Sequence, residues 1–188
     1  MDELEDLSGG EWAVLALLAE GPCHGWAAVR ALSPEGEIGR IWSLPRPLVY
    51  RALDLLAGRG LIEEDRVEGS AKGPRRTVMR VTDAGRARVD AWLREPVEHV
   101  RDVRWLLLMK LLFCERSGVD QRPLLEAQSA TLEPIVAGLT RRVRSAAADE
   151  QMLVSFRLES ARAARRFVDG QLKLAAASRG STSGPHGA

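Results

Sequence analysis

Residues 43–82 read SLPRPLVYRALDLLAGRGLIEEDRVEGSAKGPRRTVMRVT. Ser43 is expected to cap a helix that carries Pro45 and Pro47 in its first turn and ends at the glycines after Ala57. Apolar residues recur along this helix at the i, i+3, i+4, i+7 spacing of one buried face, namely Val49, Ala52, Leu53 and Leu56. Two short segments, Leu61 to Glu68 and Thr77 to Thr82, then predict a β-hairpin whose glycine- and proline-rich connection is irregular.

Helices are predicted on both sides of this stretch. Ser8 and Glu11 have capping-box spacing, so a first helix begins there and stops before Gly21-Pro22. A short second helix is expected near His24 to Leu32, and a further one from Asp83 to Arg94. Three helices followed by a two-stranded hairpin predict a winged helix-turn-helix domain over residues 1–95.

Beyond Pro96 the chain predicts only helices, over 97–116, from about 120 to 148, and from a cap at Asp149 onward. Pro134 is expected to kink or split the second of these. The last helix carries a heptad seam, spaced 4, 7, 4 and 7, of Met152, Phe156, Ala163, Phe167 and Leu174. The seam fits packing within one subunit or between two, and its spacing leaves both readings open.

The predicted fold is therefore mainly α with a small β-hairpin wing. A winged helix-turn-helix domain is followed by a C-terminal helical dimerisation domain over residues 96–175 and by a disordered tail over 176–188 that is rich in Ser, Gly, Pro and Thr.

Charge is distributed unevenly along the 188 residues. Residues 1–95 hold 13 basic and 16 acidic side chains, a net charge of −3, whereas the window from 69 to 88 alone carries +5. Contact with double-stranded DNA would therefore depend on a few well-placed residues. The candidates on the exposed face of the third helix are Arg46, Tyr50 and Arg51, and those at the hairpin tip are Lys72, Arg75 and Arg76.

Other classes of protein lack their signatures in this sequence. No apolar run approaches the roughly 20 residues of a membrane span, and no secretory signal is present, so a cytoplasmic protein is expected. The cysteines Cys23 and Cys114 are expected to be free thiols, and three scattered histidines predict no metal site. Because no phosphate-binding glycine loop or nucleophile motif occurs, we expect neither an enzyme nor a cofactor.

Several motifs across residues 7–95 resemble those of PadR-like transcriptional regulators: EWAVLALL at 11–18, GPCHGW at 21–26, VYRAL at 49–53, GLIE at 60–63, GPRR at 73–76 and VTDAG at 81–85. This chain has Trp26 where the family pattern has tyrosine in His-Gly-Tyr, and Met79 where the family has the tyrosine of Tyr-Arg-Leu-Thr. The helices after Pro96 resemble the larger subfamily with a virulence-activator-type C-terminal domain.

The resemblance implies a homodimer that forms through the C-terminal helices and binds an inverted repeat, often as a repressor released by a small aromatic or drug-like effector. Trp12, Trp105 and Met109 are the candidates for an effector pocket or a dimer interface. One alternative stays open, a winged helix that binds proteins and not DNA, because the first 95 residues have a net negative charge.

Overall fold

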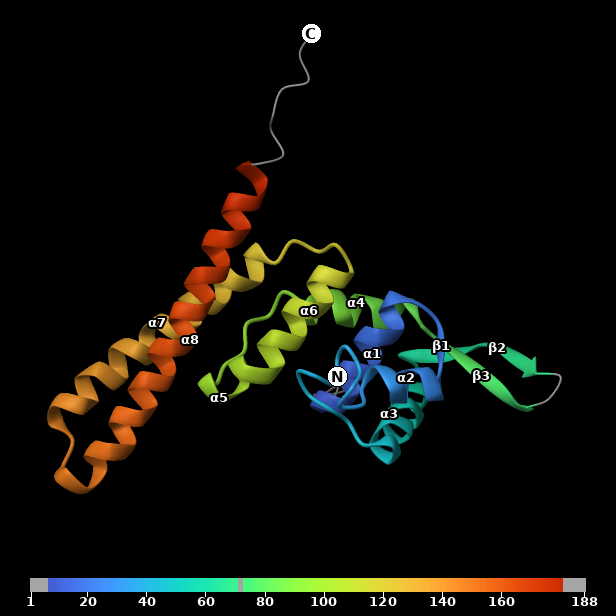
Figure 1. The fold of residues 1–188 in the computed structure, drawn as a ribbon, viewed down its shortest axis with the longest axis horizontal. Helices are drawn as coiled ribbons and strands as arrows, with labels where there is room; N and C mark the ends of the chain where they lie inside the picture. Colours follow the sequence, from blue (N-terminus) through green and yellow to red (C-terminus); the bar gives the residue numbers. More distant parts are fainter. Residues whose placement is uncertain (1–6, 71–72, 181–188) are drawn as a thin grey trace, which may run out of the picture. The chain divides into compact units, whose positions relative to one another are not determined.

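The computed structural model describes residues 7–70 and 73–180. The chain divides into two compact units (Figure 1). The first unit comprises the residues up to Leu93 together with Leu108–Gly118, and the second comprises Arg94–Leu107 and the residues from Val119 onward.

The first unit contains a three-stranded antiparallel sheet and five helices. The helices are α1 (Gly9–Glu20), α2 (Gly25–Ala31), α3 (Arg46–Gly58), α4 (Asp83–Trp92) and α6 (Leu108–Arg116). The strands are β1 (Cys23–His24), β2 (Ile62–Ser70) and β3 (Gly73–Val81), in the order β1-β3-β2. The predicted mainly helical fold with a hairpin wing is confirmed, and Figure 1 shows the hairpin extending away from the helices.

The hairpin strands are longer than predicted. They pair until Ser70 lies opposite Gly73, so residues 69–70 and 73–76, expected to be irregular, continue the ladder. The sequence analysis also missed β1, whose two residues pair with Met79 and Val78 of β3. A strand of two residues has no detectable periodicity, and only its distant partner makes it a strand.

The core of the first unit confirms the patterns read from α1 and α3. Ser8 and Glu11 form the capping box, with the Ser8 amide donating to Glu11 Oε2 at 2.7 Å. All four predicted α3 positions, Val49, Ala52, Leu53 and Leu56, are buried. Trp12 stacks on Trp92 with ring centroids 4.9 Å apart. The Ser43 cap is wrong, because α3 begins three residues later with Pro45 at its N-cap and no side-chain cap.

The helical stretch predicted over 97–116 begins at Val100 and is divided between the two units. It comprises α5 (Val100–Asp102), the π-helical turn η1 (Val103–Leu107) and α6. The unit boundary falls between η1 and α6, whereas the boundary expected at Pro96 assigns all of this stretch to the second domain.

Polar contacts explain why α6 packs within the first unit. The ammonium of Lys110 is buried, donates to the Trp92 carbonyl at 2.7 Å and lies over the Trp92 ring. At the other end of α6, Arg116 pairs with Glu20 at 2.6 Å and with Glu37. The hydrogen bond with Glu20 is the largest of the effects that raise the pKa of Arg116 above its ordinary value.

The second unit is built on the pair of helices α7 (Arg122–Ser145) and α8 (Ala148–Gly180). The buried amide of Gln128 joins α7 to the segment before α5, because it donates to the Val97 carbonyl and accepts from the Val97 amide. Pro134 lies inside α7 without splitting it, and Asp149 lies in the first turn of α8 and not at a cap. Because α8 continues to Gly180, the predicted disordered tail is wrong for 176–180, and its remainder lies outside the described residues.

The α7–α8 pair buries a different face of α8 from the predicted seam. Buried α8 side chains are Val154, Leu158, Ala161, Ala164 and Val168. Three of the five seam residues are large and exposed: Met152 at 82%, Phe156 at 71% and Leu174 at 61%. The seam therefore does not hold α8 to α7. Within the described chain, no helix is long and apolar enough to cross a membrane.

Candidate nucleic-acid interface

Helix α3 presents three of the predicted contact residues on its exposed face. Arg46, Tyr50 and Arg51 are all exposed, while the opposite face of the helix is buried in the core of the first unit. The Arg46 guanidinium lies 5.7 Å from the centroid of the Tyr50 ring, an arrangement that favours a defined position for both side chains. Two consecutive turns of α3 thus carry two guanidinium groups and one phenol toward solvent.

Two arginines of the hairpin, Arg66 and Arg80, form ion pairs with acidic residues of β2. Arg80 pairs with Glu63 at 2.6 Å, and Arg66 pairs with Glu68 at 2.7 Å and with Asp65. Hydrogen bonds with Glu68 and Asp65 raise the pKa of Arg66.

The arginines near the hairpin tip, unlike Arg66 and Arg80, form no ion pair with a described carboxylate. Arg75 and Arg76 on β3 are exposed and, among the residues the structure describes, have no carboxylate partner. Arg51 on α3 shares this property. Lys72, the third predicted tip residue, lies outside the described residues. An arginine without an internal partner keeps all its N–H donors for a ligand. Arg51, Arg75 and Arg76 are therefore the best candidates for phosphate or base contacts.

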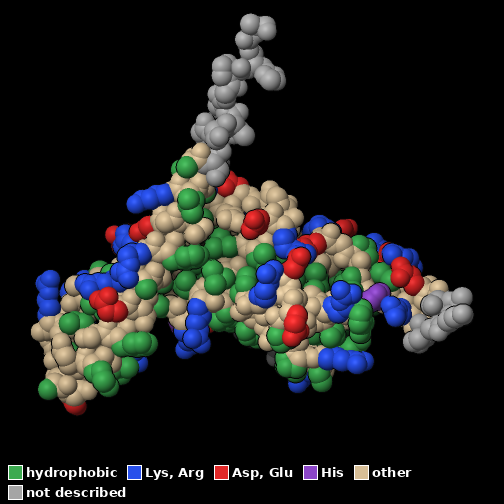
Figure 2. All heavy atoms as spheres, in the orientation of Figure 1, with side chains coloured by type: hydrophobic (Ala, Val, Ile, Leu, Met, Phe, Trp, Pro, Cys, Tyr) green, Lys and Arg blue, Asp and Glu red, His purple; other side chains and the backbone are tan. Residues whose placement is uncertain are grey.

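A cleft of about 800 Å³ connects α2, α3 and the hairpin. It brings Tyr50 together with Arg75 and Arg76, which are about 25 residues away in the sequence. Arg46 and Arg51 do not line it. Its wall also contains carboxylates, from Asp54, Glu63 and Glu64, so positive charge is confined to the side formed by β3. Figure 2 shows the resulting mixture of basic and acidic side chains around the hairpin.

The turn from β1 into α2 contributes cleft residues that the sequence analysis did not select. His24, Gly25 and Trp26 all line the cleft, and 48% of the Trp26 surface is exposed. His24 caps α2, since its Nδ1 accepts from the Ala27 amide at 3.0 Å. The His-Gly pair that matched the family pattern was the signal available in the sequence.

Gly25 has a specific steric role beside Tyr50. A Cβ atom at position 25 would lie 2.7 Å from Tyr50 Cε1 and 3.3 Å from Cζ. The α3 phenol therefore packs directly against the α2 backbone, and only glycine leaves room for it.

The predicted effector or dimer residues lie in different surroundings. Trp12 and Met109 are buried in the core of the first unit, where Trp12 stacks on Trp92. Trp105 belongs to η1 in the second unit, is half-buried and donates from Nε1 to Asp102 at 3.2 Å. Of the three, Trp105 alone keeps substantial accessible surface.

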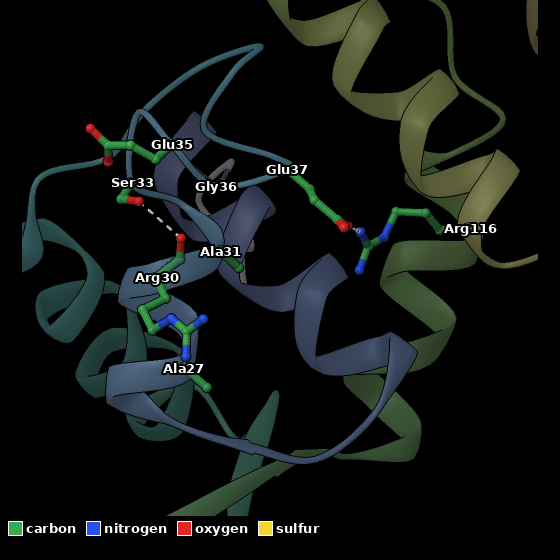
Figure 3. Close-up of a pocket in the computed structure, with 8 residues that line it drawn as sticks. All are labelled: Ala27, Arg30, Ala31, Ser33, Glu35, Gly36, Glu37 and Arg116. Carbon is green, nitrogen blue, oxygen red and sulfur yellow. Dashed lines mark hydrogen bonds and ion pairs between the residues drawn. The ribbon is translucent and has the colours of Figure 1, made fainter.

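A second hollow of about 450 Å³ lies beside the C-terminal end of α2 (Figure 3). Charges of both signs line it, from Arg30, Glu35, Glu37 and Arg116, and Arg116 is already paired with Glu37. One of the two arginines that line the hollow is therefore already engaged by carboxylates. Within the described chain, no group of His, Cys, Asp and Glu side chains could hold a metal ion.

Comparison with known proteins finds that part of the chain matches a family model. Residues 14–91 match the Transcriptional regulator PadR-like family, a family of regulators and not of enzymes. No curated protein matches the sequence.

Solved structures with a similar fold include Bacillus subtilis PadR in complex with operator DNA, with 20% identity, 89% of this chain and 99% of that chain covered, and a TM-score of 0.44. They also include the virulence activator AphA of Vibrio cholerae, with 21% identity, 93% and 100% covered, and a TM-score of 0.37. A PadR-like transcriptional regulator from Bacillus cereus has 19% identity, 90% and 99% covered, and a TM-score of 0.38. The comparison rests on the sequence match: residues 14–91, which contain most of α1, all of α2, α3 and the hairpin and nearly all of α4, match the model of the PadR-like family of transcriptional regulators.

Proposed function

We propose that this protein is a homodimeric, sequence-specific DNA-binding regulator that recognises an inverted repeat and represses transcription. The observation that carries the proposal is that α3 and the hairpin present exposed arginines that have no carboxylate partner among the described residues, namely Arg46, Arg51, Arg75 and Arg76, together with Tyr50. In a winged helix the third helix enters the major groove, where arginine can bind the O6 and N7 atoms of guanine.

The hairpin would then contact the sugar-phosphate backbone. Arg75 and Arg76 extend from β3, and three acids of β2, Glu63, Asp65 and Glu68, are already engaged with Arg66 and Arg80. Each phosphate neutralised by arginine releases counterions, so affinity should fall steeply with salt.

Dimer formation is supported by the exposed apolar surface of α8. Met152, Leu153 and Phe156 form a contiguous exposed group at its N-terminal end, and Figure 2 shows hydrophobic side chains on the surface of the α7–α8 pair. Large apolar side chains gathered on a surface favour a partner. We assign these apolar side chains to contact with a second copy of the chain, since an inverted repeat requires two DNA-binding domains about 34 Å apart.

Release by a small apolar or aromatic effector is the remaining part of the proposal. Its support is the family pattern together with the half-buried indole of Trp105, which has both an apolar surface and accessibility. Trp12 and Met109 would act on such a site only through the core in which they are buried.

The test is selection from a pool of random duplex DNA with the full-length protein. The variant R75A/R76A removes two unpaired arginines, and R141A/R144A, in α7, is the matched control that removes the same charge from exposed positions. We expect wild type and control to enrich the same inverted repeat and R75A/R76A to bind it more weakly. Each lost phosphate contact should lower the slope of log K against log salt by about 0.9.

Two outcomes would contradict the proposal. Equal binding by R75A/R76A and wild type would remove the hairpin arginines from the interface. No enrichment by the wild type, even at low salt, would favour the alternative of a winged helix that binds other proteins.

A further inference from the structure

Trp26 is a large aromatic residue that remains exposed on the surface of the first unit. Nearly half of its surface is open to solvent, at the edge of the same cleft that contains Tyr50, Arg75 and Arg76. Its indole Nε1–H has no acceptor among the described residues. A large aromatic ring with an unused donor is typical of a binding surface, because the ring packs while the N–H makes a directed hydrogen bond.

Two neighbouring side chains lie close to the indole. The Arg30 guanidinium lies over the ring, 5.1 Å from its centroid, and the centroid of the His24 ring is 6.4 Å from that of the indole. These contacts reduce the side-chain freedom that a ligand would otherwise have to remove on binding. Trp26 is therefore ordered in advance in an exposed position.

His24 adds a second neutral donor to the same edge of the cleft. Its Nδ1 accepts from the Ala27 amide, so in the neutral imidazole the proton is on Nε2. Among the described residues Nε2 has no partner, and His24 lines the cleft. Two side-chain N–H donors, from an indole and an imidazole, thus line the cleft where β1 leads into α2.

We propose that Trp26 and His24, where β1 leads into α2, hold the DNA backbone together with Arg75 and Arg76 by donating side-chain hydrogen bonds to phosphate oxygens. The inference rests on the proposed function and extends it to two further residues. The contact requires no charge and differs in this from the arginine contacts.

The absence of charge gives the proposal a distinctive test. Removing a neutral donor weakens binding but releases no fewer counterions, so the intercept of log K against log salt should fall while the slope stays the same. We expect W26A to lower affinity for the selected operator about tenfold and W26F about threefold, because each phosphate hydrogen bond contributes modestly. W26Y, which restores an aromatic ring with a donor, should bind within about twofold of wild type.

The His24 variants separate the cap from the DNA contact. H24D and H24N both retain an N-cap acceptor, so both should melt at the wild-type temperature. H24N keeps an N–H donor and should bind nearly as well as wild type, whereas H24D presents a carboxylate to phosphate and should lose at least about tenfold. V67A, at an exposed apolar position on β2 that does not line the cleft, is the control for loss of apolar surface.

The outcomes distinguish this inference from the proposed function. If wild type binds the operator and W26A and H24D bind equally well, the inference is wrong while the proposed function stands. If W26A also changes the salt slope, or if W26F and W26Y bind alike, the indole N–H is not the contact. If the wild type selects no DNA, the proposed function itself fails. Circular dichroism of each variant shows whether a loss of binding comes from a loss of fold, and the W26F–W26Y pair answers the question if W26A does not fold.

Discussion

Tyr50 owes its position to the absence of a side chain at Gly25. The two residues come from different helices, and the phenol edge lies where a Cβ atom of residue 25 would be. The backbone of Gly25 does not have a positive φ, so alanine is compatible with the chain conformation there. The glycine is needed for the orientation of a contact residue and not for the turn.

Substituting G25A should therefore affect binding more than stability. The Tyr50 ring can rotate away from the new methyl group into solvent, which removes its DNA contact at a cost of about threefold to tenfold in affinity. The melting temperature should change little. The measurement is operator affinity in a cycle with Y50A, because G25A should have no further effect once Tyr50 is gone. Additive losses would contradict a shared cause.

Cys23 offers a prediction about chemical reactivity. Burial raises the pKa of its thiol above the ordinary value, so at pH 8 a smaller fraction is thiolate than in an exposed cysteine. In the C114S background, iodoacetamide should alkylate Cys23 more slowly than free cysteine at that pH. The rate should rise to its plateau at a higher pH than the free thiol requires. A rate equal to that of free cysteine would contradict the assigned burial.

At the scale of elements, the junction between β3 and α4 joins several parts of the winged helix. Thr82 caps α4 by accepting from the Gly85 amide at 3.1 Å, and its hydroxyl donates to the Gly60 carbonyl at 2.8 Å. Gly85 lies against the backbone just before β2, where a Cβ atom would approach the Leu61 carbonyl to 2.1 Å. Two residues of the VTDAG motif therefore have a structural role: Thr82 caps α4, and Gly85 allows a close backbone contact.

The expected effect of G85A is a loss of about 3 kcal/mol in the free energy of unfolding, from forced displacement of the Leu61 backbone. T82A should lose about 1–2 kcal/mol with the cap. G58A is the matched control, because no atom lies within 4 Å of a Cβ there. It should be neutral or stabilise the protein by up to about 1 kcal/mol. Urea unfolding measures the free energy of unfolding of all three variants. A G85A variant as stable as G58A would show that a Cβ atom at position 85 does not displace the Leu61 backbone.

At the scale of the whole molecule, the two faces of α8 have separate roles. One face packs on α7 through Val154, Leu158 and Val168, and the other exposes Met152, Phe156 and Leu174. The helix pair is therefore complete without the seam, which leaves the seam for the dimer that we propose.

The variant M152E/F156E tests this division. It leaves the α7-facing residues unchanged, so helix content should stay at the wild-type level, while two buried charges would disrupt a dimer interface. We expect sedimentation to show a monomer. Operator affinity should fall at least about tenfold, because a monomer has only one DNA-binding domain. R101E, on an exposed arginine of α5, is the charge control. A double variant that remains dimeric would assign the interface to another surface.

The sequence by itself determined those elements whose cause is local. The capping box of Ser8 and Glu11, the buried face of α3 and the hairpin each depend on residues within a few turns of one another, and all are present. The exposed arginines of α3 followed from the same helical periodicity. The family motifs of residues 7–95 agreed with these local patterns.

Tertiary structure alone decided features in which a residue's partner is distant or ambiguous. The strand β1 exists only through its pairing with β3, and α6 joins the first unit through Lys110 and Arg116. The contact of Gly25 with Tyr50 joins two helices and leaves no periodic signal. In α8, residues with heptad-like spacing occur on two faces, so periodicity detected an apolar seam but packing against α7 chose the other face. Periodicity reports that a face is apolar, and only the packed structure determines what covers it.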